Sequence, residues 1–212
     1  MLVERRGQRF VAKTAALTEA SAAWEAALLE FLQKHGLIVP LLLRALSGGF
    51  TAGGLILMTY VEGRAPATAD DWQAVAGYLE RVHQLTRSWP ARPDMPTVIS
   101  LLGTNDELRQ GMDAGARLLL RKAWSPIARS PTSVIHGDPN AHNVIVTADG
   151  PALIDWEESR VDFSVLDEAG LPGGESIPEA YAAALAWEAF LFWESDTTYA
   201  WRCLSRLEGV IN

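Results

Sequence analysis

Residues 133–155 read SVIHGDPNAHNVIVTADGPALID, and this stretch decides the fold. Its second half has two short apolar runs on either side of an Asp-Gly pair, the pattern of a β-hairpin with a tight turn. Asn143 precedes the first run and Asp155 follows the second, so an antiparallel hairpin brings both side chains to its open end. Oxygen ligands of this kind suit Mg²⁺, which takes one or two carboxylates and completes its shell with water and substrate phosphates. The hairpin therefore predicts a magnesium–nucleotide site at Asn143 and Asp155.

Asp138 lies in the loop before this hairpin, five residues ahead of Asn143. A carboxylate there can accept the proton of an attacking hydroxyl. The order His136, Asp138, Asn143 and then Asp155 matches the catalytic loop and metal motif of protein kinases. The alternative is a chance His-Gly-Asp beside an ordinary hairpin, which requires loop, spacing and hairpin to coincide independently.

The loop has Gly137 after its histidine, and the metal motif reads Asp155-Trp156-Glu157. In these features the chain resembles the aminoglycoside phosphotransferase and choline kinase superfamily. The resemblance implies transfer of the γ-phosphate of ATP or GTP to a hydroxyl of a small molecule, with Asp138 as the catalytic base and Mg²⁺ as the metal.

The same resemblance implies two supporting residues. His136 is expected to pack and hold the catalytic loop. Asp167, in the stretch Asp167-Glu-Ala169, is expected to brace that loop by hydrogen bonds.

A kinase-like site also needs a lysine on a strand, for the nucleotide phosphates, and a helical glutamate that holds the lysine. Lys13 ends the strand-like stretch Phe10-Val-Ala-Lys13. Glu25 lies on the apolar stripe of the next helix, where a lone carboxylate requires a partner because an unpaired buried charge is costly. We therefore expect Lys13 and Glu25 to pair and clamp the α- and β-phosphates. The alternative is that both side chains lie in water.

Residues Met58, Thr59, Tyr60 and Val61 resemble the superfamily's hinge, where backbone groups bind the nucleotide base. This hinge divides the chain into an N-terminal nucleotide-binding lobe, residues 1–61, and a C-terminal catalytic and substrate lobe, residues 62–212. The expected fold is α+β and protein-kinase-like, with a small β-sheet lobe and a larger, mainly helical lobe that carries the catalytic hairpin.

The expected elements of the small lobe are a hairpin turning at Arg6-Gly7, a helix from a Thr18 cap to Gly36, and strands at 41–46 and 55–61 around a glycine-rich loop. In the larger lobe the pattern predicts helices within 70–85, 106–124 and 177–207. The first strand resembles the second strand of the superfamily, so the small lobe looks truncated, without the first strand and the Gly-rich phosphate loop. A catalytically silent kinase-fold binding protein is therefore the alternative to an active kinase.

The net charge of −8 and the pI near 5.0 argue against a nucleic-acid binder, which needs basic clusters. They suit a cationic substrate, the alternative being that the acidity serves solubility alone. Candidate contacts to such a substrate are Glu157, Glu158 and Asp162. Further candidates are Glu188, Glu194, Asp196, Trp187, Trp193 and Trp201, the alternative being helix core and solvated surface.

The single cysteine, Cys203, cannot form an intramolecular disulfide, which favours a reducing cytoplasm. The apolar runs are shorter than the roughly 20 residues of a membrane span, so we expect no membrane segment. The sequence gives no indication of an oligomeric state.

Overall fold

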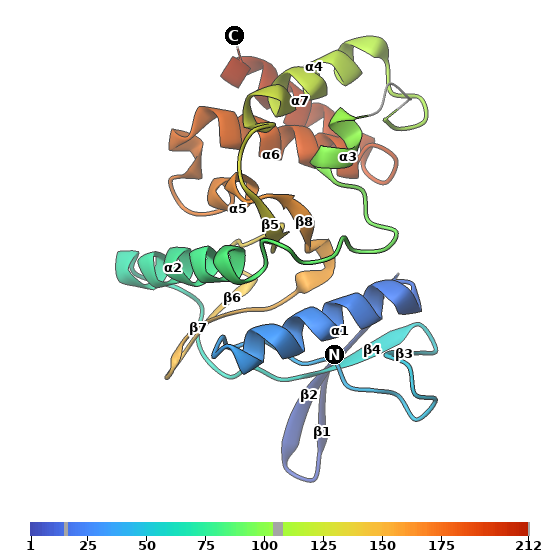
Figure 1. Cartoon of the computed structure of the whole chain (residues 1–212), viewed down its shortest axis with the longest axis vertical. Coiled ribbons are helices and arrows are strands. Elements are labelled where there is room, and N and C mark those ends of the chain that lie inside the picture. The colour runs from blue at the N-terminus through green and yellow to red at the C-terminus, as the bar shows by residue number, and fades with distance from the viewer. Residues whose placement is uncertain (15–16, 104–107, 212) are drawn as a thin grey trace.

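The computed structural model describes residues 1–14, 17–103 and 108–211, which form two lobes (Figure 1). Within these residues, the smaller lobe contains an antiparallel four-stranded sheet in the order β1-β2-β4-β3, together with helix α1. The predicted hairpin at Arg6-Gly7 is confirmed, and both residues adopt the positive φ (53° and 75°) that such a turn requires. The elements of this lobe are β1 Leu2–Arg5, β2 Gln8–Thr14, α1 Glu19–Lys34, β3 Thr51–Ala52 and β4 Leu55–Thr59.

Helix α1 has the expected limits. The Thr18 hydroxyl accepts a hydrogen bond from Ser21 N at 3.2 Å and caps its N-terminus. The helix stops before Gly36, whose φ of 81° is a left-handed conformation that glycine adopts without strain. Its apolar stripe is buried, with Leu28 and Leu29 both at 0% exposure.

The strand predicted at 41–46 does not form. This segment joins β4 through an isolated bridge between Leu42 and Met58 and a hydrogen bond from Leu41 N to Thr59 Oγ1. β3 pairs with the same edge of β4 at Leu55 and Ile56. β3 arises inside the glycine-rich loop, where the Glu19 carboxylate accepts hydrogen bonds from the backbone N–H and the hydroxyl of Thr51. A side chain of α1 thus holds the loop in place, an interaction that hydrophobic patterning does not report.

The larger lobe is mainly helical, and it carries the remaining strands near the interface with the sheet (Figure 1). Its elements are α2 Ala69–Leu85, α3 Val98–Leu102, α4 Ala114–Trp124, η1 Ser125–Ile127, β5 Thr132–Ile135, β6 Val144–Thr147, β7 Gly150–Leu153, η2 Trp156–Glu158, β8 Arg160–Phe163, α5 Val165–Ala169, η3 Gly174–Ser176, α6 Pro178–Leu191 and α7 Thr197–Ile211.

The helix predicted within 70–85 is confirmed as α2. The helix predicted within 106–124 begins only at Ala114, where Asp113 accepts a hydrogen bond from Ala116 N, and Asp106 lies outside the described residues. The range 177–207 holds two helices, α6 and α7, with a break between them.

The predicted catalytic hairpin is confirmed as β6 and β7, which pair from Val144 opposite Leu153 to Thr147 opposite Gly150. β5 pairs with β8, a strand that the sequence pattern did not predict. The chain entering the second lobe crosses β6 closely: a Cβ at Gly63 would lie 2.4 Å from Val146 O, so only glycine fits this crossing.

One hydrophobic core runs from α1 and the sheet into α2 and the hairpin, and a second core fills the helical lobe. The first core includes Leu29 of α1, Leu79 of α2 and Leu153 of β7. The lobe boundary near residue 61 therefore stays a prediction, because apolar packing continues across it.

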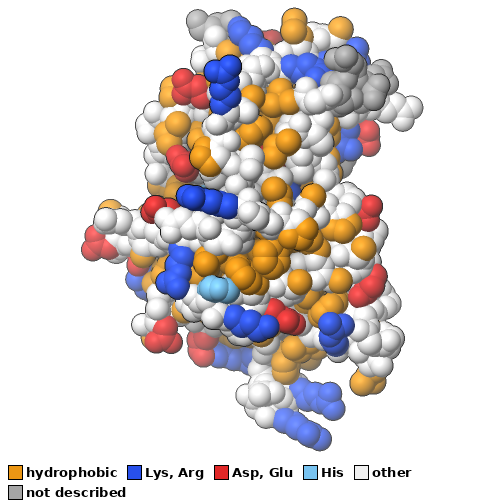
Figure 2. Space-filling view, in the orientation of Figure 1, with side chains coloured by type: hydrophobic (Ala, Val, Ile, Leu, Met, Phe, Trp, Pro, Cys, Tyr) orange, Lys and Arg blue, Asp and Glu red, His pale blue; other side chains and the backbone are white. Residues whose placement is uncertain are grey.

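Charged side chains are scattered over the face seen in Figure 2, with acidic and basic groups interspersed among hydrophobic ones. In the described part of the chain, no helix is both long enough and apolar enough to cross a membrane.

Leu28→Ala tests the packing of α1. Because Leu28 has no exposed surface, its truncation leaves a cavity, and we expect the free energy of unfolding to fall by about 3 kcal/mol in urea titrations. Glu30→Ala on the exposed face of the same helix is the control and is expected to stay within about 0.5 kcal/mol of wild type. Equal losses in both variants would contradict this packing.

Candidate active site

The catalytic loop and the hairpin come into direct contact through Asn143. Its Nδ2 donates to Asp138 Oδ2 and to Asp138 O, both at 2.9 Å. Ile154 N donates to Asn143 O at 2.9 Å, which sets Asp155 beside the start of β6. The predicted convergence of loop and hairpin is thus a hydrogen-bonded arrangement. A second amide, Asn140 Nδ2, donates to Asp138 Oδ1 at 2.7 Å, so both oxygens of the candidate base are oriented.

Asp167 lies behind the catalytic loop and is fully buried. It accepts hydrogen bonds from His136 N at 3.0 Å, Gly137 N at 2.9 Å and His83 Nε2 at 2.8 Å. Burial alone would raise the pKa of Asp167, but the hydrogen bonds from His83 and Gly137 outweigh it and hold that pKa below its ordinary value. A buried carboxylate with these three donors fixes the start of the loop.

His136 is buried beneath the same loop and packs edge-on against Trp156, with ring centroids 4.8 Å apart. Its Nε2 lies 2.9 Å from Ile154 O, which only accepts, and Asp138 N lies 3.3 Å from Nδ1. This pattern assigns the ring proton to Nε2. Burial lowers the pKa of His136, in keeping with a neutral ring that links the loop to β7.

On the metal side, Asp155 sits in a left-handed conformation with φ of 63°. Lys13 Nζ contacts Asp155 Oδ1 at 2.7 Å and Glu157 Oε1 at 2.9 Å. Burial alone would lower the pKa of Lys13, but the two carboxylates outweigh it and raise that pKa. The lysine of the small lobe therefore faces the motif that was predicted to bind metal.

The donor set fits Mg²⁺. Asn143 uses Nδ2 for both of its bonds to Asp138, which leaves its Oδ1 as a ligand, and Asp155 supplies a carboxylate. The described residues contain no group of three or more His, Cys, Asp or Glu side chains arranged to hold a metal, so protein ligands alone do not form a cage. A site of this kind requires water and phosphate oxygens as further ligands.

The expected Lys13–Glu25 pair is corrected by the structure. Glu25 is fully buried and pairs with Arg92, with Nη2 and Oε2 2.6 Å apart. Burial raises the pKa of Glu25, against the opposing effect of Arg92. The helix periodicity showed that Glu25 needs a partner, but it could not show that an arginine 67 positions away supplies it.

A narrow cavity of about 180 Å³ lies beside the predicted hinge. Its lining includes all four predicted hinge residues as well as Lys13 and Asp155, and apolar walls formed by Val11, Pro40, Ile145 and Ile154. The predicted base-binding and phosphate-binding residues thus share one cavity.

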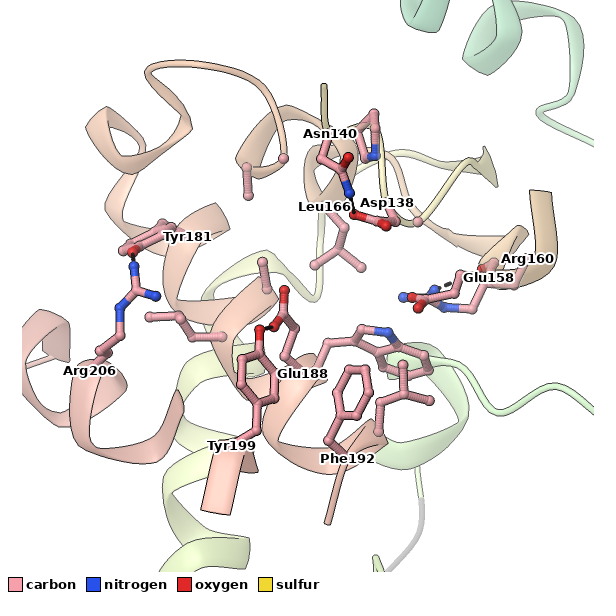
Figure 3. A pocket seen from close by; sticks show the side chains of 18 residues that line it. Asp138, Asn140, Glu158, Arg160, Leu166, Tyr181, Glu188, Phe192, Tyr199 and Arg206 are labelled. Atoms are coloured by element: carbon pink, nitrogen blue, oxygen red, sulfur yellow. Dashed lines mark hydrogen bonds between the residues drawn. The ribbon is translucent and has the colours of Figure 1, made fainter. Parts of the chain in front are cut away.

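A wider cavity of about 430 Å³ opens on the other side of the catalytic loop (Figure 3). Asp138 and Asn140 lie on one wall, Glu188 and Tyr199 on the opposite wall, and Glu158 with Arg160 at a third side. Tyr199 donates its hydroxyl proton to Glu188 Oε2, and the Arg160 guanidinium stacks on Trp187 at 3.5 Å. Asp138 is therefore the candidate base at the edge of a space large enough for a small molecule.

Of the three carboxylates predicted to meet a substrate, only Glu158 lines this cavity. Burial raises the pKa of Glu158 to about 7. Glu157 faces Lys13 instead. Asp162 is fully buried and accepts hydrogen bonds from Arg160 Nε and Val98 N, so it is corrected to a structural residue.

Several lining residues escaped the sequence analysis. Asn140 lies within the catalytic loop, where the motif did not single it out. Tyr181, Tyr199 and Arg206 belong to helices whose sequence pattern indicated only an apolar face. Arg206 contacts the Tyr181 hydroxyl across the two last helices. Because the packing of α6 on α7 creates this wall, local sequence gave no signal for it.

A two-lobe kinase-like fold with this loop and hairpin defines a phosphotransferase. The phosphotransferase enzyme family (APH) matches residues 1–201, and the chain belongs to this family. A sequence comparison with curated proteins gives no match.

Solved structures agree on the fold. Choline kinase LicA from Streptococcus pneumoniae has a TM-score of 0.70 and 16% identity, covering 99% of this chain and 88% of that one. Amicoumacin kinase hAmiN, in complex with AMP-PNP, Ca²⁺ and Ami, has a TM-score of 0.69 and 13% identity, covering 97% and 83%. A thermostable mutant of aminoglycoside phosphotransferase APH(4)-Ia has a TM-score of 0.69 and 11% identity, covering 99% and 89%.

Asp167→Asn tests the brace behind the loop. One amide oxygen cannot serve three donors, and we expect a loss of about 3 kcal/mol in the free energy of unfolding at pH 7. The pKa of Asp167 is depressed in the folded state. The stability contributed by its carboxylate is therefore fully present above the unfolded pKa of about 3.9 and is lost as the pH falls further.

Urea titrations from pH 7 to pH 3 measure this effect. The difference in the free energy of unfolding between wild type and Asp167→Asn should narrow below about pH 4. Glu168→Gln, at an exposed neighbouring position, should lose little unfolding free energy at any pH. A gap that is constant over the whole range contradicts the assigned role.

Proposed function

We propose that the chain is a small-molecule kinase that transfers the γ-phosphate of ATP or GTP to an acceptor hydroxyl. The observation that carries the proposal is the Asn143–Asp138 contact between two cavities, one lined by the hinge, Lys13 and Asp155, the other by Asp138. A donor in the first cavity and an acceptor in the second face each other across the catalytic loop.

The chain's own residues perform three tasks in this proposal. Asp138 takes the proton of the acceptor hydroxyl as it attacks, and Asn140 and Asn143 keep both carboxylate oxygens aimed. Lys13 turns from its carboxylate partners toward the phosphates. Met58 to Val61 bind the nucleotide base. Most of the rate enhancement then comes from positioning and charge neutralisation.

Asn143 and Asp155 would hold Mg²⁺, which neutralises charge on the phosphate oxygens when bound. The complex of hAmiN contains a nucleotide analogue and Ca²⁺, which supports a metal–nucleotide donor for this fold. A cytoplasmic location is part of this proposal, because the single cysteine suits a reducing compartment.

The acceptor we propose is a small alcohol with a cationic group. The cavity beside Asp138 places Glu158 and Glu188 among the aromatic side chains of Tyr181, Trp187 and Tyr199, a setting that suits an ammonium ion. The name of one structural neighbour, choline kinase LicA, is consistent with such an acceptor. The cavity lining has three carboxylates against two arginines, and together with the net charge of −8 this disfavours nucleic acid as the substrate.

Asp138→Asn tests the proposed base. Turnover of the best acceptor from a panel of amino alcohols and aminoglycosides should fall about a thousandfold, because the amide cannot take the proton. Binding of Mg–ATP or Mg–GTP, measured by calorimetry, should stay within about twofold of wild type. Asp149→Asn, at the exposed turn of the hairpin, is the control and retains activity.

If wild type binds neither nucleotide with Mg²⁺ and phosphorylates no acceptor in the panel, the kinase proposal is wrong. The silent kinase-fold binding protein then becomes the preferred function.

Glu158 makes acceptor binding depend on pH. Since burial raises its pKa to about 7, the carboxylate is neutral below this pH and charged above it. The affinity for a quaternary ammonium acceptor such as choline, whose charge does not titrate, should therefore rise about fivefold, or roughly 1 kcal/mol, between pH 6 and pH 8. Calorimetry measures it, and Glu158→Gln should bind weakly with a flat profile. A pH profile unchanged in this variant would exclude Glu158.

A further inference from the structure

Arg92 lies in the irregular connection between α2 and α3, yet its side chain is fully buried. The guanidinium enters between α1 and the turn η2 that directly follows Asp155. It also lies over the Trp24 ring, 5.2 Å from the centroid. Its hydrogen bonds run from Nε to Ser21 Oγ (2.7 Å), from Nη2 to Glu25 Oε2 (2.6 Å), and from Nη1 to Trp156 O (2.9 Å), Glu157 O (3.2 Å), Ser159 O (3.0 Å) and Ser159 Oγ (2.9 Å).

The two ends of this contact belong to different lobes. Glu25 and Ser21 lie on α1, in the sheet lobe, whereas residues 156–159 belong to the metal motif. A buried guanidinium requires both a counter-charge and acceptors for its N–H groups, and here α1 supplies the charge while the turn supplies carbonyls. One of those carbonyls, Trp156 O, also accepts hydrogen bonds from Ser159 N at 3.1 Å and from the Ser159 hydroxyl at 2.6 Å. Arg92 therefore links α1 to the turn through hydrogen bonds on both sides.

The turn that Arg92 holds carries functional residues on both sides. Asp155 precedes it in a left-handed conformation, Glu157 contacts Lys13, and Glu158 reaches the acceptor cavity. A shift of this turn would move the metal-binding carboxylate and the lysine contact together. Lys13 itself is engaged by Asp155 and Glu157, so Glu25 is committed to Arg92 rather than to the lysine.

We propose that Arg92 is a positioning residue of the phosphoryl-transfer site: paired with Glu25, it fixes the turn 156–158 and so sets Asp155 for metal binding. In this chain the glutamate of α1 thus acts on the metal motif through an arginine and not on the phosphates through Lys13. This inference rests on the kinase function proposed above, because that function gives the metal site its role.

Arg92→Lys is the main variant, because it keeps the charge but loses the multiple donors of the guanidinium. We expect the Mg²⁺ concentration for half-maximal turnover to rise about tenfold, with kcat largely recovered at saturating Mg²⁺. Glu25→Gln should shift it in the same direction, since it leaves Arg92 without its counter-charge. Arg121→Lys, at an arginine that donates to Leu101 O far from the site, is the control and should behave as wild type.

A double-mutant cycle separates Arg92 from Lys13 as the partner of Glu25. We compare the effects of the substitutions on the Mg–nucleotide binding free energy, measured by calorimetry. The effects of Glu25→Gln and Arg92→Lys should be non-additive, and those of Glu25→Gln and Lys13→Met should be additive. The reverse pattern, or a folded Arg92→Lys protein with wild-type Mg²⁺ dependence, overturns the proposal.

Two measurements keep the test decisive. If Arg92→Lys does not fold, Ser159→Ala removes the hydroxyl that accepts from Arg92 Nη1 and donates to Trp156 O, and we expect about a threefold shift in Mg²⁺ requirement. Amide hydrogen exchange of residues 155–159 should speed up in Arg92→Lys and Glu25→Gln but not in Lys13→Met, with or without nucleotide. Unchanged exchange refutes the link, whereas a wild type that binds no Mg–nucleotide refutes only the kinase function.

Discussion

The buried carboxylate of Asp167 holds the catalytic loop in place, and the rest of the site is built outward from it. Its oxygens accept hydrogen bonds from the backbone N–H groups of His136 and Gly137, so the loop leaves β5 in one defined direction. That direction is further restricted at Gly137, where φ is 94° and a Cβ would lie 2.8 Å from Glu158 O. Asp138 follows at once, and its place beside Asn143 is a consequence of this anchoring.

Buried ion pairs repeat this arrangement elsewhere. Two of them join segments that are distant in sequence, and the third links two residues of β8. Each is costly unless both charges are fully hydrogen-bonded. They are His83 with Asp167 behind the catalytic loop, Arg160 with Asp162 beside the acceptor cavity, and Arg92 with Glu25 beneath the metal motif.

Much of the fold was accessible from the sequence because it is local. The hairpin of β6 and β7 closes within a few residues around an Asp-Gly turn, and α1 carries its cap and stop signal in the chain itself. β8 was not predicted, because its partner β5 lies far earlier in the chain and a short buried strand has no distinctive pattern. The segment 41–46 has the sequence pattern of a strand. In the structure it forms an isolated bridge with β4, and β3 pairs with another part of the same edge.

The sequence by itself predicted the candidate catalytic set of Asp138, Asn143 and Asp155. Spacing and turn chemistry bring Asn143 and Asp155 to one end of a hairpin, and Asp138 lies in the loop before it. Only the tertiary structure decided which charges pair and which side chains enclose the acceptor cavity. A helical period shows that Glu25 faces inward, but the choice between Lys13 and Arg92 depends on how an irregular connection packs beneath α1. That choice is made by burial and hydrogen-bond geometry between segments about 70 residues apart, which no local pattern encodes.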